Sequence, residues 1–128
     1  PATSSAASDV YKRQVFTPYN KKLNDEVIEY IEEEGFKVTS NSYFGIESDV
    51  DIGKVDQNYL YDVLSKIDVD RADALFISCT ALPALSIIEK LEKKLNRIVL
   101  SSNQALIWDT LQEIGNKEPI EGFGKLFR

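Results

Sequence analysis

The 128-residue sequence contains no histidine and no methionine, and it has a single cysteine, Cys79. Without histidine the chain by itself cannot form a Ser-His-Asp triad, a Cys-His dyad or an imidazole-ligated metal site. One cysteine cannot form an internal disulfide, which favours a reducing cytoplasm as the location. These absences leave the thiol of Cys79 as the first candidate for nucleophilic or acid–base chemistry.

Positive charge and long apolar runs are also scarce. The 15 Lys and Arg residues are outnumbered by 21 Asp and Glu residues, for a formal net charge of −6. No basic stripe is available to neutralise phosphates, and no apolar run approaches the ~20 residues needed to span a bilayer. No signal-peptide pattern is present. We therefore expect no nucleic-acid partner and no insertion into a membrane.

The first 14 residues lack apolar periodicity. Within them, Asp-Val-Tyr-Lys-Arg-Gln at residues 9–14 matches the translation of a common transposon-based sequencing adapter in one reading frame. This favours a non-native, adapter-derived origin for residues 1–14, and the alternative is a natural, disordered Ser/Ala-rich tail. The native reading frame would then begin near Val15, and residues 15–128 would form a single α/β domain. Residues 11–14 would also bring polar side chains into a strand that should be apolar.

Strands and helices alternate along the rest of the chain. Strands are expected at residues 15–17, 36–44, 72–78 and 98–100. Apolar residues at helical spacing predict helices within residues 23–31, 60–67, 85–95 and 105–111. Asn20 or Asn24 is the candidate N-cap of the first helix, and Asp56 is that of the second. Residues 46–55 are expected to form a loop, and residues 116–128 receive no assignment.

This order of elements defines an α/β fold. With right-handed crossovers it predicts a four-stranded parallel sheet in the order 2-1-3-4, with helices on both faces, as in one flavodoxin-like half. The carboxyl ends of parallel strands form the edge where such folds bind ligands. Candidate functional residues are therefore those that follow the strands.

Cys79 and Tyr19 both follow predicted strands. Cys79 stands where the strand at residues 72–78 ends and where, by the pattern, a helix begins with Pro83 near its first turn. A thiol at a helix N-terminus can be a usable nucleophile or base, although free cysteine is often a small buried apolar residue. Tyr19 is either a surface residue in a turn or a hydroxyl donor to a substrate carboxylate or enolate.

Polar residues also follow the second and fourth strands. The run Ser-Ser-Asn-Gln at residues 101–104 exceeds what one N-cap requires, so part of it could line a pocket, and the backbone amides could bind a carboxylate. Asp49 and Asp51 could form a turn, a cap or a general acid. Gly122 and Gly124 do not make a dinucleotide-binding fingerprint, because no strand precedes them.

Five segments carry a resemblance to a known family: Val-Phe-Thr-Pro-Tyr at 15–19, Gly-Ile-Glu-Ser-Asp-Val-Asp-Ile-Gly at 45–53, Phe-Ile-Ser-Cys-Thr at 76–80, Val-Leu-Ser-Ser-Asn-Gln-Ala at 99–105, and Ile-Glu-Gly-Phe-Gly at 120–124. They resemble the C-terminal half of maleate cis-trans isomerases. They are equally similar to the related ectoine-utilisation and arylmalonate decarboxylase proteins of the Asp/Glu racemase superfamily. The resemblance covers essentially residues 15–128, and the Ser-Cys-Thr and Ser-Ser-Asn-Gln segments are fairly specific for the maleate isomerase-like branch.

The resemblance implies a cofactor-free enzyme with two pseudo-symmetric α/β halves, each contributing a cysteine or its replacement to a site between them. Cys79 would be the second-half cysteine, acting as acid and base toward the substrate carbon. The implied substrate-binding residues are Tyr19, Asp49, Thr80, Ser102, Asn103 and Gln104. Asp49 stands where maleate isomerases usually carry an asparagine, and an ionised aspartate would repel a dicarboxylate. An amide, amino-acid or monocarboxylate substrate therefore stays open.

The family's first half, with the cysteine that is expected to add to the substrate double bond, is missing from this sequence. We therefore expect the chain alone to be inactive. Its expected partner is the missing N-terminal half of the same protein, and without it the chain should self-associate through exposed apolar surface. The parent enzyme is expected to be a homo-oligomer acting on a small carboxylate. Racemisation or decarboxylation stays open within the family. The rival from another class is a single-domain module that binds a small anion and has a structural Cys79, which would then be an unreactive thiol.

Overall fold

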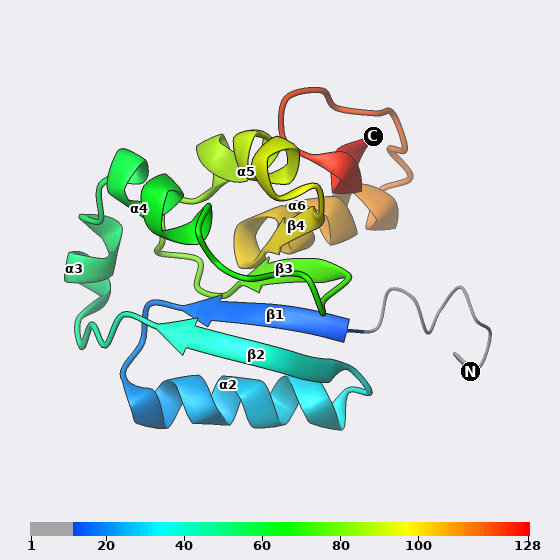
Figure 1. Cartoon of the computed structure of the whole chain (residues 1–128). Coiled ribbons are helices and arrows are strands. Elements are labelled where there is room, and N and C mark those ends of the chain that lie inside the picture. The colour runs from blue at the N-terminus through cyan, green and yellow to red at the C-terminus, as the bar shows by residue number, and fades with distance from the viewer. Residues whose placement is uncertain (1–11) are drawn as a thin grey trace.

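The computed structural model describes residues 12–128, so most of the segment at residues 1–14 lies outside the described residues. Four strands, β1 (Lys12–Thr17), β2 (Lys37–Tyr43), β3 (Ala74–Ile77) and β4 (Ile98–Ser101), form one sheet. All neighbouring strands are parallel and their order is β2-β1-β3-β4. The predicted α/β fold and sheet order are confirmed (Figure 1).

Helices lie on both faces of this sheet. They are α2 (Lys21–Glu33), α3 (Asp49–Gly53), α4 (Gln57–Leu64), α5 (Ile88–Leu95) and α6 (Ser102–Glu113), with single 3₁₀ turns η1 (Leu85–Ile87) and η2 (Lys125–Phe127). The step from β1 to β2 crosses the sheet in the opposite direction to the steps toward β3 and β4. Right-handed crossovers therefore put α2 on one face and α4 and α5 on the other, as Figure 1 shows.

Side-chain caps determine where two of the helices begin. The Asn20 Oδ1 atom accepts a hydrogen bond of 2.9 Å from the backbone N–H of Leu23, so Asn20 is the N-cap of α2. Asn24, the other candidate, lies within the helix and is buried. Asp56 caps α4 as predicted, because its carboxylate accepts from the backbone N–H of Tyr59 at 2.9 Å.

The core lies between the sheet and the pair α4 and α5. Side chains of alternate strand residues point to this side, which we call the covered face, and none of them is more than 1% exposed: Phe16, Leu75, Ile77 and Val99. Leu60, Leu64, Ile88 and Leu91 of the two helices pack against them and are equally buried. Burying each such side chain stabilises the fold by about 1.5–3 kcal/mol.

The opposite side of β3 and β4, which we call the open face, is less complete. Phe76 and Leu100 are paired in register and point to this side, and both are only partly buried. The interleaved neighbours of the same strands are fully buried on the covered face. The two faces of one sheet therefore differ in how well the described residues cover them.

β1 begins at Lys12, before the predicted start at residue 15, and it carries polar side chains into the sheet as the sequence indicated. Gln14 is 3% exposed, and its Oε1 atom has no hydrogen-bond partner among the described residues. The guanidinium of Arg13 lies 4.7 Å from the ring centroid of Phe36. Desolvation lowers the pKa of Arg13, and the charge of Asp73 opposes that shift.

The C-terminal segment, unassigned from the sequence, folds back against α5 and β4. The buried carboxylate of Glu92 accepts from the backbone N–H groups of Val99 at 3.0 Å and Lys125 at 2.9 Å. Gly124 has φ +97°, and a Cβ atom there would lie 2.7 Å from Cγ2 of Ile88. Glycine is therefore required where the chain passes over these side chains.

Candidate active site at the carboxyl edge of the sheet

The carboxyl ends of the four strands gather most of the predicted site residues at one edge. Tyr19 follows β1, Asp49 follows β2, Cys79 follows β3 and Ser102 follows β4. Since the strands are parallel, these segments lie at the same end of the sheet. Residues far apart in the sequence are thus brought to a common edge.

Tyr19 lies close enough to Cys79 at this edge for the two side chains to interact. Burial raises the pKa of the Tyr19 hydroxyl to about 12, and a hydrogen bond to Cys79 acts in the same direction. The charge of Asp49 also raises this pKa, whereas a hydrogen bond with Ser78 lowers it. Tyr19 therefore stays protonated at physiological pH and can donate to the sulfur atom of Cys79.

Backbone hydrogen bonds hold the loop that carries Tyr19. The carbonyl oxygens of Thr17, Pro18 and Tyr19 accept from the N–H groups of three consecutive residues after β2 at 3.1, 2.9 and 2.8 Å: Phe44, Ile46 and Gly45, respectively. The loops after β1 and β2 are therefore joined over three residues. This restricts the backbone on both sides of the tyrosine.

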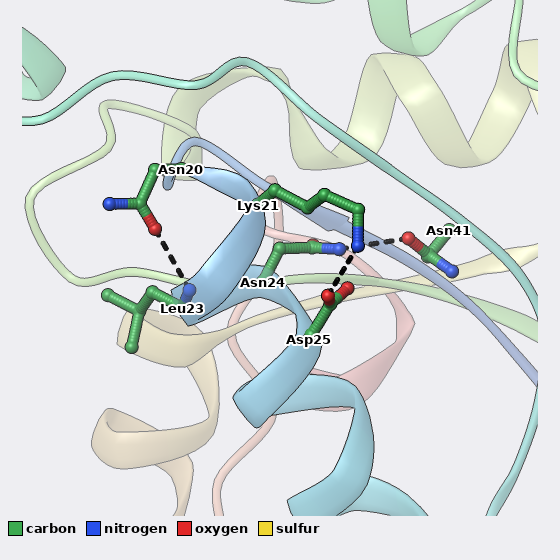
Figure 2. A network of polar contacts seen from close by, with 6 residues as sticks. All are labelled: Asn20, Lys21, Leu23, Asn24, Asp25 and Asn41. Atoms are coloured by element: carbon green, nitrogen blue, oxygen red, sulfur yellow. Dashed lines mark hydrogen bonds and ion pairs between the residues drawn. The ribbon is translucent and has the colours of Figure 1, made fainter.

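A chain of polar side chains, from buried Thr17 and Asn24 to exposed Asn41, supports the same loop. The Thr17 hydroxyl donates to Oδ1 of Asn24 at 2.8 Å, and Nδ2 of Asn24 donates to Oδ1 of Asn41 at 2.9 Å. Figure 2 shows the Asn24–Asn41 contact, together with the Asn20 cap at the start of α2. The end of β1, the first turns of α2 and the middle of β2 are thus linked by polar side chains, which fixes the position of the loop.

Cys79 has an unusual backbone conformation. Its φ angle is +104°, in a region that L residues other than glycine rarely adopt, and the side chain is buried at 8% exposure. Such a conformation costs about 1–3 kcal/mol and persists when neighbouring contacts enforce it. The N–H of Cys79 donates to Oγ of Ser102 at 3.1 Å, and Nδ2 of Asn103 donates to the carbonyl of Thr80 at 2.9 Å. The first turn of α6 therefore holds the turn that carries the thiol.

The predicted helix start directly after Cys79 is wrong. The chain passes through turns at residues 78–84, and helical structure begins only with η1 at Leu85 and α5 at Ile88. Two features prevent an earlier start: the positive φ of Cys79 and Pro83, which disfavours helical geometry at the residue before it. The helix after β3 therefore does not begin at the thiol, and the helix N-terminus that contacts the cysteine turn is that of α6, through Ser102.

Gln104 lies apart from the other predicted site residues. Its side chain is fully buried, its Oε1 accepts from the N–H of Ser101 at 3.1 Å, and its Nε2 donates to the carbonyl of Phe123 at 2.8 Å. With the Ser101 hydroxyl accepting from its N–H, it completes a capping box at the start of α6. Gln104 therefore joins α6 to the C-terminal segment.

Two further placements complete the site. Asp49 is exposed in the first turn of α3, a short helix within the predicted loop that begins with the Ser48 side chain accepting from the N–H of Val50. Ser78, which was not among the predicted site residues, hydrogen-bonds Tyr19. Ser78 lies two positions after Phe76. Because side chains alternate along a strand, the sequence could have placed Ser78 on the same side of the sheet as Phe76.

The side chains and helices of residues 12–128 limit the kinds of site that this part of the chain can form. No group of three or more His, Cys, Asp or Glu side chains in that range could hold a metal ion. None of the helices in the same range is long and apolar enough to cross a membrane. The fold and the edge thus define a parallel α/β unit with a cysteine-centred candidate site.

The chain belongs to the arylmalonate decarboxylase family, whose model matches residues 3–127. It is 31% identical over 116 residues to a maleate isomerase of Geobacillus stearothermophilus, covering 90% of this chain and 46% of that protein. The crystal structure of a maleate isomerase from Pseudomonas putida S16 superposes with a TM-score of 0.88 at 25% identity, covering 96% of this chain and 51% of that one. The match to the family begins within the segment for which the sequence favours an adapter origin.

A second similar structure adds a chemical detail about that protein. It is a cysteine-to-serine mutant of the Nocardia farcinica maleate cis-trans isomerase with a covalently bound succinylcysteine intermediate, and it has a TM-score of 0.89 at 24% identity. It too is matched over only 49% of its length. The chain therefore spans about half the length of the curated relatives and solved structures named here.

Proposed function

We propose that this chain is the second half of a cofactor-free cysteine isomerase that acts on a small carboxylic acid. The longer protein that would contain it is called the parent below. The observation that carries the proposal is the position of the Tyr19 hydroxyl beside the thiol of Cys79 at the ligand edge of the sheet, where the two groups interact. The family membership and the half-length match to maleate isomerases support it. A free thiol is also consistent with a parent that works in a reducing cytoplasm.

In the proposed reaction a cysteine of the absent half adds through its thiolate to one carbon of the substrate double bond, while the Cys79 thiol protonates the neighbouring carbon. The resulting single bond rotates. The Cys79 thiolate then takes the proton back as the carbon–sulfur bond breaks and the double bond forms again. The succinylcysteine intermediate of the Nocardia isomerase is the corresponding saturated adduct in that protein.

Tyr19 has a defined role in this cycle. Cys79 alternates between thiol and thiolate. A hydroxyl that stays protonated can donate a hydrogen bond to the thiolate and so stabilise it, without taking up the proton that Cys79 must exchange with the substrate. The raised pKa of Tyr19 keeps it in the donor state throughout. Ser102 and Asn103 hold the backbone of Cys79 and Thr80, so we assign them positioning roles next to the substrate and leave Gln104 outside the site.

Asp49 bears on the choice of substrate. Its carboxylate acts on Tyr19 electrostatically, so a second substrate carboxylate at that position would meet a like charge. We therefore propose a substrate that presents an amide, an ammonium group or no charge to Asp49. The Asp49→Asn variant of the parent should gain activity toward maleate, measured as kcat/KM, because it removes that repulsion.

The test of the proposed function uses the parent and three variants. Cys79→Ser should lower the rate of maleate isomerisation, or that of the preferred substrate, by about 10³-fold or more, and Tyr19→Phe by about 10²-fold. Tyr59→Phe, which changes an exposed tyrosine on α4, should leave the rate unchanged. Product formation is followed by proton NMR. A Cys79→Ser parent with wild-type rate would refute the catalytic role and favour a binding module with a structural cysteine.

A second candidate reaction is decarboxylation, because the matching family model describes an arylmalonate decarboxylase. Cys79 would then protonate the carbon from which CO₂ departs, and no second cysteine would be needed. Release of CO₂ from phenylmalonate by the parent, abolished by Cys79→Ser, would select this reaction over isomerisation. In both cases the 128-residue chain alone should be inactive, because the site lacks its other side.

A further inference from the structure

The open face of the sheet carries a groove among the described residues. It has a volume of about 490 Å³ and lies between α2 and strands β3 and β4. Arg13 and Glu34 contribute charged groups to its lining. The rest of the lining is mainly apolar and consists of Tyr30, Ile31, Phe36, Phe76 and Leu100. Tyr30, in the last turn of α2, is 62% exposed. A sheet whose strands are apolar on both sides is expected to be covered on both sides.

This groove continues to the candidate active site. A second hollow of about 380 Å³ shares Tyr30, Ile31 and Phe76 with it and is also lined by Ser78 and Ser102. Ser78 hydrogen-bonds Tyr19, and Ser102 accepts from the N–H of Cys79. An occupant of the groove would therefore reach the residues that hold the thiol.

Helix α6 adds a second uncovered apolar surface. Gln104 is its one buried residue, and Leu106, Ile107 and Ile114 are all exposed. The helix is anchored at its first turn by the capping box and by Ser102 and Asn103. Its later turns thus present apolar side chains that no described element covers.

We infer that the groove between α2 and β4 is the docking surface for an apolar segment of the first half of the same protein. The inference rests on the two-half reading of the proposed function. The chain spans about half the length of its relatives, so a polypeptide of comparable size is available to cover the face. The groove leads to the same edge where that half must stand to complete the site.

The experiment compares the surface of this chain with that of the parent by hydroxyl-radical footprinting and mass spectrometry. Tyr30 is the reporter, and Tyr59 is the matched control, since it is a helix tyrosine with 57% exposure away from the groove. Oxidation of Tyr30 should fall roughly fivefold in the parent, in proportion to the exposure lost in an interface core. Oxidation of Tyr59 should be equal in the two proteins.

Each outcome decides the inference. Protection of Tyr30 that is independent of protein concentration supports an occupant within the same polypeptide. Protection that rises with concentration, in the parent or in this chain, identifies a second copy and overturns it, as does equal oxidation of Tyr30 in both proteins. None of these readouts depends on turnover. The docking surface can therefore be refuted while the proposed function is retained, and the proposed function can be refuted while the docking surface is retained.

A pair of variants gives an independent check. Tyr30→Glu should lower the Tm of the parent by about 5 °C, because it puts a charge into an apolar interface, and should leave the Tm of this chain nearly unchanged. Tyr59→Glu should affect the parent and this chain alike. A parent that tolerates Tyr30→Glu as well as this chain does would overturn the inference.

Discussion

The covered and open faces of the sheet come from the same strands, yet they differ in how they are completed. On the covered face Leu75 and Val99 are fully buried beneath α4 and α5. One residue further along each strand, Phe76 and Leu100 are only partly buried. Both strands read as continuous apolar runs, which is typical of strands packed on both sides. The comparison shows that the sequence specifies two packing partners and that residues 12–128 supply only one of them in full.

The largest expected effect is on the free energy of unfolding when a leucine is truncated on one face or the other. Leu75→Ala on the covered face should lower the free energy of unfolding by about 2–5 kcal/mol, because it leaves a cavity in a packed core. Leu100→Ala on the open face should lower it by less than about 1.5 kcal/mol, since the side chain is already partly hydrated. Urea unfolding of both variants measures the difference. Equal losses would show that the open face is as well packed as the covered one.

A smaller effect concerns a defect within the covered face. Gln14 is in register with Leu75 and is buried with its Oε1 atom unpartnered. Gln14→Leu should therefore raise the free energy of unfolding by about 1–2 kcal/mol. The exposed Gln57→Leu should change it by less than about 0.5 kcal/mol. An adapter-derived origin of residues 1–14, which we propose, accounts for an amide at this position; destabilisation by Gln14→Leu would count against that origin.

The smallest effect lies at the edge where the faces meet. The pKa of Tyr19 is raised from 10.0 to about 12 in the folded chain, so between these values the unfolded chain releases the proton while the folded chain retains it. The stabilisation from neutral Tyr19 is complete below pH 10 and is lost as the pH rises through about 12. Denaturant unfolding across this range should show a steeper decline for the wild type than for Tyr19→Phe. Parallel declines would contradict the raised pKa.

The elements that could be predicted from the sequence are those governed by local repetition. The strand order followed from alternating elements and right-handed crossovers, and Asp56 was identified as a cap because its side chain acts on residues three positions away. The start of the helix after Cys79 could not be found in this way, since Leu85, Ile88 and Leu91 fix a helical period but not its first residue. The turn before it depends on a positive φ that no local pattern marks.

The candidate site was predictable to a similar degree. The edge that gathers Tyr19 and Cys79 follows from parallel topology, whereas the approach of their side chains depends on how the loops after β1, β2 and β3 are held in the tertiary structure. The Ser-Ser-Asn-Gln run shows the limit most clearly. Ser101 and Gln104 have the three-residue spacing of a capping box, which is visible in the sequence, while the hydrogen bonds of Ser102 and Asn103 with the cysteine turn depend on the tertiary structure.

The positive φ of Cys79 means that the thiol is present at the cost of a strained backbone. Glycine adopts this conformation without the steric penalty of a Cβ atom, so Cys79→Gly would relax the turn at the same time as it deletes the thiol. A single base change converts a cysteine codon into a glycine codon. If Cys79 has the proposed catalytic role, a lineage that no longer needed the reaction could exchange activity for stability in one step, and retention of the thiol would report selection for the reaction.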